Sequence, residues 1–291
     1  MRYEGPIYRP PSEADSLLIQ ATVGCPHNRC AFCMVYKNGP RFRVRPAEDI
    51  VADLREARRT RGRNVRTLFL PAGNTIAMPT DALVSVLEAA RNIFPALKRI
   101  TVYGSSPMIR RKGPDDLARL ARAGLSRIHV GLESGDDEVL RRIVKGTTAG
   151  EQETAGRWAM EAGIELSVYV ILGIGGVERS AQHAGATREL LNRLSPDFIR
   201  LRTFVPKVHT PLLADVEAGR FEMLDAHGVL RETRALLDGL TARSRLASDH
   251  YTNYLNLSGN LPEDVPRLLR EIDAALERDA ADFRPFFVGN V

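Results

Sequence analysis

The stretch of sequence that decides the fold reads Leu17-Leu18-Ile19-Gln20-Ala21-Thr22-Val23-Gly24-Cys25-Pro26-His27-Asn28-Arg29-Cys30-Ala31-Phe32-Cys33. It begins with an apolar run typical of a buried strand and ends in a loop that holds all three cysteines of the 291-residue chain. A chain that places every thiol in one short loop uses the thiols together. Three thiolates after a strand can hold three irons of a cubane iron–sulfur cluster and leave the fourth iron open for chemistry.

A zinc site is the alternative interpretation of this loop, with His27 completing a set of three cysteines and one histidine. Zinc motifs usually place their ligands in two well-separated pairs, whereas all candidates here lie in one short loop. His27 follows Cys25 by two residues, which is cramped for tetrahedral closure. The iron–sulfur interpretation is therefore favoured, and His27 is interpreted as a neighbouring or surface histidine.

Composition and cysteine usage favour a cytoplasmic protein. Its 44% hydrophobic content is ordinary for a protein with a full core. No apolar run reaches the length of a membrane span, the first residues lack the apolar part of a signal peptide, and an odd, clustered set of cysteines suits a reducing compartment. The net charge is +5, but acidic residues are interspersed throughout the chain. This pattern argues against nucleic acid as a partner, and an anionic small substrate accounts for the positive charge equally well. The chain is expected to be a monomer or a homodimer, with no membrane contact.

The chain repeats a unit of short apolar strand, turn and amphipathic helix. The predicted strands cover residues 17–22, 65–70, 99–103, 127–132, 165–172 and 198–204. The predicted helices between them cover residues 47–60, 80–93, 114–123, 151–162 and 181–194. Because right-handed crossovers curl a parallel sheet in one direction, the sequence predicts an α/β fold with a partial (β/α)6 TIM-like barrel.

The repeat ends near residue 205. Residues 1–205 are therefore predicted to form the barrel, and residues 206–291 a helical C-terminal extension packed on it. The extension is expected to hold helices near 224–240 and 263–278, separated by the polar stretch 248–254.

The cysteine loop and the barrel pattern together resemble the radical S-adenosylmethionine (SAM) superfamily. Its members hold a [4Fe–4S] cluster on three cysteines, usually spaced Cys-x3-Cys-x2-Cys, whereas this chain has Cys-x4-Cys-x2-Cys. The sequence of the cysteine loop is similar to that of a poorly characterised branch of the superfamily, which is distantly related to oxygen-independent coproporphyrinogen dehydrogenases. The resemblance implies that Cys25, Cys30 and Cys33 bind the cluster and that Phe32 packs beside SAM.

The same resemblance implies further SAM-binding residues after the second and fourth predicted strands. Ala72, Gly73 and Asn74 occupy the place of a Gly-Gly-Glu-like turn that binds the SAM amino group; an ordinary strand-to-helix turn is the alternative. Glu133, with Ser134 as helper, occupies the place of the residue that faces the ribose or methionyl end. The alternative for Glu133 is a favourable charge at the start of the next helix.

The fifth and sixth predicted strands supply the remaining candidates of the barrel. Ile171 and Gly173 lie in a glycine-rich turn that resembles the element packing on adenine, and Arg200 in the sixth strand is placed to reach SAM or a carboxylate. A solvated strand edge is the alternative for Arg200. In the extension, His250 and Tyr251 are candidate catalytic residues, since a tyrosine can donate hydrogen to a product radical; a packed surface loop is the alternative.

The resemblance implies an oxidoreductase or lyase that reductively cleaves SAM at the cluster. The resulting 5′-deoxyadenosyl radical would abstract hydrogen from a small anionic metabolite, and a flavodoxin- or ferredoxin-type protein would supply the electron. Two alternatives remain: a non-catalytic relative resembling haem chaperones, and an RNA-modifying enzyme suggested by the positive net charge. No cysteine is left for a second cluster, which argues against the methylthiotransferases.

Overall fold

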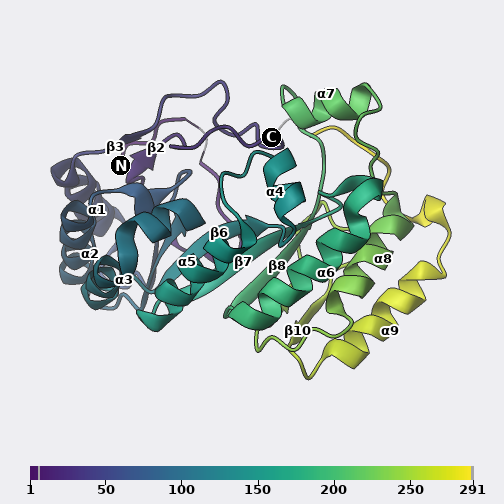
Figure 1. The fold of residues 1–291 in the computed structure, drawn as a ribbon. Helices are drawn as coiled ribbons and strands as arrows, with labels where there is room; N and C mark the ends of the chain where they lie inside the picture. The colour runs from purple at the N-terminus through teal and green to yellow at the C-terminus, as the bar shows by residue number, and fades with distance from the viewer. Residues whose placement is uncertain (6, 290–291) are drawn as a thin grey trace. The chain divides into compact units, whose positions relative to one another are not determined.

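The computed structural model describes residues 1–5 and 7–289, and the described chain divides into two compact units (Figure 1). The first unit comprises Met1–Asn28, Val35–Val130 and Thr154–Leu166. The second unit comprises Arg29–Met34, Gly131–Glu153 and the chain from Ser167 onward. Each unit is an α/β assembly of parallel strands and helices.

The first unit contains the opening strands of the sheet. In spatial order these are β1 (Leu17–Leu18), β4 (Thr67–Leu70), β5 (Arg99–Gly104) and the first residues of β6 (Arg127–Glu133). All pair in parallel, and the register places Leu68 between Leu17 and Ile100. Helices α1 (Ala47–Arg61), α2 (Thr80–Ile93) and α3 (Ser106–Ala123) lie in a row beside these strands (Figure 1).

The helices of the first unit form where apolar residues recur at helical spacing. In α2 the buried Leu83, Val86, Leu87 and Ala90 fall on one face, as a helix packed on a sheet requires. Pro79 immediately precedes this helix, and its missing N–H costs nothing there because the first helical N–H groups have no partner in the helix. Amphipathic spacing and proline placement together fix the bounds of α2.

The first predicted strand is shorter than expected. β1 ends at Leu18, and the chain then pairs as β2 (Thr22–Val23) with the antiparallel β3 (Arg43–Val44) in a separate two-stranded sheet. The cause is Arg45, whose buried guanidinium donates to the Gln20 carbonyl at 2.5 Å and to Asp53 at 2.7 Å. These bonds hold the chain after Leu18 against the segment that follows the cysteine loop.

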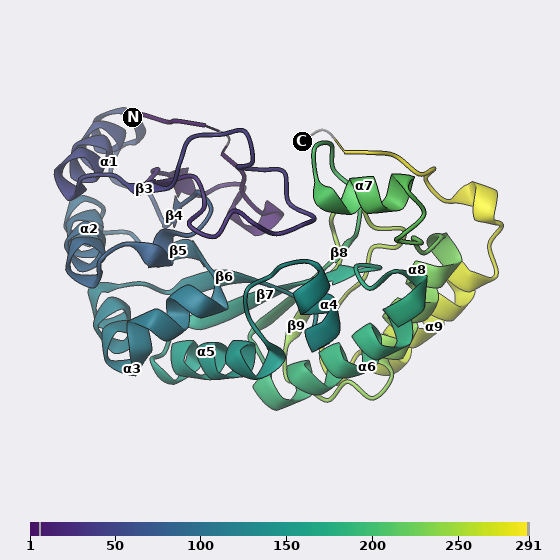
Figure 2. The ribbon, with the colours of Figure 1, turned by 45° about the horizontal axis from the view of Figure 1, so that its top comes forward.

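The second unit contains the closing strands and the C-terminal residues. Its strands are the end of β6, β7 (Glu165–Leu172, from Ser167 onward), β8 (Phe198–Thr203), β9 (Arg245–Ala247) and β10 (Ser258–Asn260). β7, β8 and β9 are parallel, and β10 is antiparallel to β9. Helices α6 (Gly176–Leu194), α8 (Ala226–Leu237) and α9 (Val265–Leu276) lie side by side (Figure 2).

The remaining elements are short or join the two units along the chain. They are η1 (Pro11–Glu13), η2 (Thr75–Ala77), α4 (Asp137–Arg142), α5 (Ala149–Glu161), α7 (Pro211–Glu217) and η3 (Ala280–Asp282). The six predicted strands are all present and the α/β fold class is confirmed. The extension holds helices as expected, but it also adds β9 and β10, and the boundary at residue 205 stays a prediction.

A buried carboxyl group organises the start of the first unit. Glu13 is fully buried, accepts a hydrogen bond from Ser16 at 2.6 Å, and lies 3.3 Å from His129 Nε2 and 3.1 Å from an Arg99 nitrogen. Burial alone raises the pKa of Glu13, but the hydrogen bonds from His129 and Ser16 and the charge of Arg99 lower it to about 2.

Among the described residues, no helix is long and apolar enough to cross a membrane.

Candidate cofactor site

The first part of the cysteine loop belongs to the first unit. Cys25 is partly exposed, and the Asn28 N–H points at its Sγ at 3.5 Å. Asn28 has a φ of 44° and is held there because its side-chain amide donates to the Tyr36 carbonyl at 2.9 Å. Lys37 Nζ in turn donates to the Asn28 carbonyl at 2.8 Å. The loop therefore directs a backbone donor at a thiol, an arrangement that tunes iron–sulfur ligands.

The turn after β4 packs directly on this part of the loop. The Gly73 N–H donates to the Gly24 carbonyl at 3.2 Å. A Cβ added at Gly73 would lie 2.8 Å from each of three atoms: the Cys25 Cβ, the Gly24 carbonyl oxygen and the Tyr36 ring. Ala72, with a φ of 90°, adopts a conformation that non-glycine residues seldom take. The predicted SAM turn and the first cysteine are thus parts of one packed structure.

Asn74 presents an acceptor in the same turn. The residue is 1% exposed, and its Nδ2 donates to Ser105 Oγ at 2.7 Å. Its Oδ1 is buried and accepts no hydrogen bond within the part of the chain that the structure describes. Since buried polar atoms are nearly always paired, this oxygen fits a ligand that brings its own donor, such as an ammonium group.

The second part of the cysteine loop, with Cys30 and Cys33, belongs to the second unit. Backbone hydrogen bonds fix Ala31 on both sides: its N–H donates to the Ile143 carbonyl at 2.8 Å, and its carbonyl accepts from Leu212 at 3.0 Å. Phe32, between the two cysteines, packs against a buried apolar cluster that also receives Ile171. The loop is therefore anchored on α4 and α7, and Phe32 and Ile171, both predicted to contact SAM, pack on the same cluster.

Glu133 ends β6 in a strained conformation and is paired with a lysine. Its φ is 63°, it is 7% exposed, and its carboxylate lies 2.7 Å from Lys145 Nζ. That ammonium group also lies 5.9 Å from the centre of the Phe32 ring. Burial lowers the pKa of Lys145, but Glu133, Cys30 and Cys33 outweigh it and raise the pKa above its usual value. A cation is thus held beside the second part of the cysteine loop.

Lys145 is a functional candidate that sequence reasoning missed. Its only signal was the pair Lys145-Gly146 that follows Glu133 in the chain, and nothing in that spacing shows that α4 returns the lysine to the end of β6. The strained backbone of its partner Glu133 supports a functional role, because non-glycine residues with positive φ gather at functional sites.

Ser134 is fully buried and makes internal contacts. Its Oγ lies 2.8 Å from Nδ1 of His183, and its carbonyl accepts a hydrogen bond from Gln152 at 3.1 Å. Two residues on, Asp136 caps α4 and pairs with Arg179 at 2.7 Å. Ser134 therefore anchors the end of β6, and its predicted contact with SAM stays a prediction.

Gly173 directly follows β7, whereas Arg200 lies within β8. Gly173 follows β7 with a φ of 78°, and its N–H donates to Glu232 Oε1 at 2.6 Å. Arg200 is 8% exposed, donates to Ser167 Oγ at 3.1 Å and lies 5.8 Å from the centre of the Phe198 ring. The solvated-edge alternative does not describe Arg200, since its side chain is buried.

His250 and Tyr251 lie in the loop between β9 and β10. His250 Nδ1 lies 2.7 Å from Thr252 Oγ1, and burial, with Arg202 and Lys207, lowers the pKa of His250 to about 4. Tyr251 is 61% exposed, with its ring 4.5 Å from the His250 ring. Their catalytic role stays a prediction.

The cysteine loop and its surroundings fit an iron–sulfur cluster and SAM. Among residues 1–5 and 7–289, no three His, Cys, Asp or Glu side chains form a ligand group for a single metal ion. A cubane cluster needs no such convergence, because each thiolate binds a different iron. The thiol donors, the unpaired Asn74 oxygen and the close backbone packing of Gly73 on Cys25 suit the two cofactors.

Comparison with known families agrees with this site. Residues 19–183, more than half of the chain, match the radical SAM superfamily, and the chain belongs to that superfamily. Its members are enzymes that bind a [4Fe–4S] cluster and SAM.

Two curated relatives share part of the sequence. The chain is 28% identical over 226 residues to the tRNA-2-methylthio-N(6)-dimethylallyladenosine synthase of Sorangium cellulosum, a match that covers 70% of this chain and 44% of the relative. It is 31% identical over 188 residues to the enzyme of the same name from Chlorobium luteolum, covering 62% and 41%. The chain thus spans less than half the length of these relatives.

Solved structures show the same fold at low sequence identity. The cobalamin-dependent SAM radical enzyme OxsB superposes with a TM-score of 0.60 at 14% identity, covering 76% of this chain and 41% of that one. Coproporphyrinogen III oxidase from Escherichia coli gives 0.57 at 18%, covering 78% and 52%. Methylornithine synthase (PylB) gives 0.53 at 16%, covering 92% and 84%. The expected fold, a TIM-like barrel of the radical SAM type, is confirmed.

Proposed function

We propose that this enzyme reductively cleaves SAM and uses the product to abstract hydrogen from a small anionic metabolite. The observation that carries the proposal is the contact of the SAM turn with the cysteine loop, where Gly73 packs on Gly24 and Cys25 with no room for a Cβ. When bound, the [4Fe–4S] cluster and SAM supply a 5′-deoxyadenosyl radical. This chain's residues then have only to bind the cofactors, orient the substrate and exclude water.

The cofactor-binding roles follow from the chemistry of each side chain. Cys25, Cys30 and Cys33 hold the cluster as thiolates. The unpaired Asn74 Oδ1 suits the SAM amino group, and the Glu133 carboxylate, with Lys145 compensating part of its charge, suits hydroxyl or ammonium donors. Phe32, Ile171 and the Gly173 turn offer apolar and backbone surface to the adenosyl part, and Ala72 and Ser134 position the two turns.

The substrate class follows from the charges around His250. Burial, together with the charges of Arg202 and Lys207, lowers the pKa of His250 to about 4, so two cations lie near an imidazole that is neutral at pH 7. Arg200 adds a buried guanidinium on the neighbouring strand β8. Carboxylates and phosphates are favoured by such groups. His250 and Tyr251 are proposed to face this anionic substrate.

RNA modification is the second candidate, and the curated relatives favour it. Both carry names that describe modification of a tRNA adenosine. This chain covers less than half of their length and has three cysteines in all, so the matched region supports shared SAM chemistry more strongly than a shared substrate.

An anaerobic assay tests the proposal. We expect chain with a reconstituted cluster, given SAM and either dithionite or a reduced flavodoxin or ferredoxin, to form 5′-deoxyadenosine. A triple variant that carries Cys25→Ala, Cys30→Ala and Cys33→Ala should form no 5′-deoxyadenosine. Stimulation by a pool of small carboxylates supports the metabolite, stimulation by tRNA supports the second candidate, and an intact cluster that forms no 5′-deoxyadenosine contradicts both and favours the haem-chaperone alternative.

A further inference from the structure

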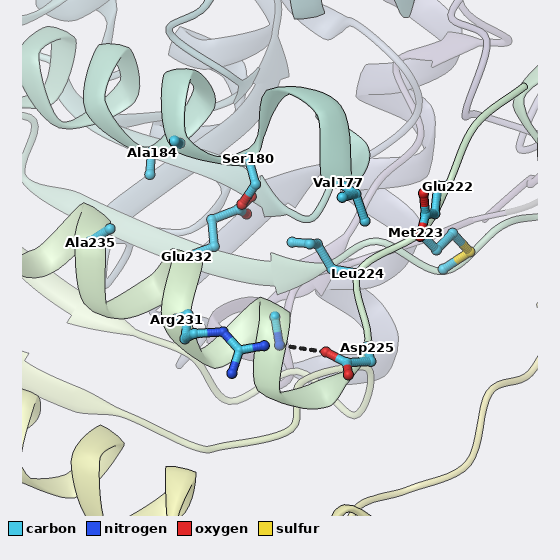
Figure 3. A pocket seen from close by; sticks show the side chains of 12 residues that line it. Val177, Ser180, Ala184, Glu222, Met223, Leu224, Asp225, Arg231, Glu232 and Ala235 are labelled. Carbon is cyan, nitrogen blue, oxygen red and sulfur yellow. Dashed lines mark hydrogen bonds between the residues drawn. The ribbon is translucent and has the colours of Figure 1, made fainter.

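A buried carboxyl group from the C-terminal residues holds the turn that follows β7. Glu232 lies on α8 and is 3% exposed. Its Oε1 accepts the Gly173 N–H at 2.6 Å, and its Oε2 accepts the Ser180 hydroxyl at 2.6 Å. Figure 3 shows the Glu232 and Ser180 side chains meeting between α6 and α8. One oxygen thus holds the turn after β7, and the other holds the start of α6.

This turn needs an acceptor from outside its own strand. Gly173 and Gly176 have φ values of 78° and 65°, so the backbone leaves the strand direction as soon as β7 ends. A buried N–H group without an acceptor costs free energy comparable to a lost hydrogen bond. Glu232 satisfies the N–H of Gly173 and fixes the direction of the turn.

His183 packs between the same carboxyl group and the end of β6. It lies on α6, is fully buried, and its Nδ1 is 2.8 Å from Ser134 Oγ. Its Nε2 lies 3.7 Å from Glu232 Oε1 and makes no hydrogen bond to a described residue. Burial lowers the pKa of His183, so the ring is neutral at pH 7 and adds no charge to this contact. Glu232 is therefore hydrogen-bonded to the turn after β7, and its contact with His183 is packing alone.

A groove lies beside Glu232, and truncating this side chain would open it toward the Gly173 turn. It has a volume of about 560 Å³ and is lined by Ser180, Ala184, Arg231 and Glu232, among others (Figure 3). A side chain truncated at position 232 would extend this groove toward Gly173. Water would then compete for the freed N–H, and the turn would lose its fixed conformation.

We propose that Glu232 is a positioning residue of the SAM site, through which residues 206–291 hold the Gly173 turn in the conformation that receives adenine. The inference rests on the proposed function in one respect, the assignment of Ile171 and Gly173 to the adenosyl part of SAM. It assigns a role to the C-terminal residues that the cysteine loop and the barrel pattern do not reveal.

Three variants of one residue and a matched control test the proposal. Glu232→Ala removes both acceptors. Glu232→Gln keeps both contacts with one acceptor, because the amide oxygen can accept the Gly173 N–H while the amide nitrogen donates to Ser180 Oγ, which reverses the direction of the second hydrogen bond. Glu232→Asp keeps the charge but withdraws the carboxyl group by one methylene. Arg234→Ala is the control, since it removes an exposed ion pair with Asp273 from the same helix.

The readouts are affinities measured by anaerobic equilibrium dialysis of cluster-loaded protein, with iron content recorded alongside. We expect Glu232→Ala to weaken SAM binding about tenfold and Glu232→Asp to weaken it by a smaller factor. Glu232→Gln should stay within about threefold of wild type and Arg234→Ala should leave the affinity unchanged. Free methionine, which lacks the adenosyl part, should bind wild type and Glu232→Ala equally.

Each remaining outcome has a defined meaning. Equal SAM affinity in wild type and Glu232→Ala would overturn the positioning role. So would a parallel loss of methionine and SAM binding in Glu232→Ala and Glu232→Asp, because that pattern shows general loss of structure. Failure of wild-type protein to bind SAM at all would instead contradict the proposed function, so the two failures are distinguishable.

Discussion

Gly73 is the residue at which the cysteine loop and the SAM turn depend on each other most directly. An added Cβ meets the Gly24 carbonyl and the Cys25 Cβ at 2.8 Å, and neither can swing aside as the end of a long side chain would. We expect Gly73→Ala to lower the free energy of unfolding by about 2 kcal/mol and to reduce the iron bound per chain. Urea unfolding and iron analysis measure both effects.

Gly185 supplies the control for that substitution. It lies within α6 with no atom within 4 Å of its would-be Cβ, so Gly185→Ala should keep full iron content. Its stability should stay the same or rise by up to about 1 kcal/mol, since alanine favours helix. Equal iron content in the two variants would show that crowding at Gly73 has no bearing on the cluster.

Glu13 makes stability depend on pH. Its pKa falls from 4.5 to about 2 on folding, so the folded state favours the ionised form. The stabilisation is complete above the unfolded pKa and is lost as the pH falls from about 5 toward 2, and it corresponds to about 3 kcal/mol for a shift of this size. We expect Glu13→Gln to be less stable at pH 7 and to lose less stability than wild type between pH 5 and pH 3, by urea unfolding. The hydrogen bond from Arg141 also lowers the pKa of Glu138, but that pair is exposed and weakened by water, so Glu138→Gln should change the slope far less than Glu13→Gln. A Glu13→Gln slope equal to wild type would contradict the assignment.

At the scale of the element, α4 depends on the residue that caps its N-terminus. Asp136 accepts the N–H groups of Glu138 at 2.8 Å and Val139 at 3.2 Å and also pairs with Arg179. We expect Asp136→Ala to lower the free energy of unfolding by about 2 kcal/mol, because it removes the cap of α4 and leaves Arg179 without this carboxylate partner. Asp136→Asn keeps the capping oxygen and should cost about half as much. Thermal unfolding measures the stability lost in each variant. Equal losses in Asp136→Ala and Asp136→Asn would show that capping contributes nothing.

The elements that the sequence predicted well are those whose signal is local. β7 and α2 have the bounds that their apolar spacing and flanking Pro79 indicate. β1 is shorter than predicted, because the buried side chain of Arg45 diverts the residues after Leu18, a contact that no local pattern contains. α4, β9 and β10 were missed because elements of three to six residues leave too little periodicity.

In the candidate site, too, residues with a local sequence signal differ from residues that only tertiary packing brings into place. The cysteines, the Gly73 turn and Glu133 are candidates that motif and strand-end position indicate from the sequence, and their roles stay predictions. Lys145 and Glu232 were missed, because each reaches its partner from a helix or loop whose return path the sequence does not show. Side chains that support a site from a distance are fixed by tertiary packing, and spacing alone carries no record of them.

At the scale of the whole molecule, cofactor binding should contribute to stability. A ligand that binds only the folded chain raises the unfolding temperature by mass action, and an unfolded chain does not hold the cysteines in a preformed site. We expect anaerobic reconstitution to raise the unfolding temperature by about 5 °C or more and chelation under air to reverse the gain. Calorimetry measures the shift, and the variant without the three cysteines should show none; a gain in that variant would place the iron elsewhere.

The crowding at Gly73 also constrains how this scaffold can be re-engineered. A library that randomises residues 72–74 in search of new reactivity would be filtered first by cluster assembly, and surviving clones would carry glycine at the middle position whatever substrate was used for selection. Diversity introduced around Arg202 and His250 meets no such filter. Directed evolution of this enzyme should therefore start from the loop between β9 and β10 and leave the turn after β4 untouched.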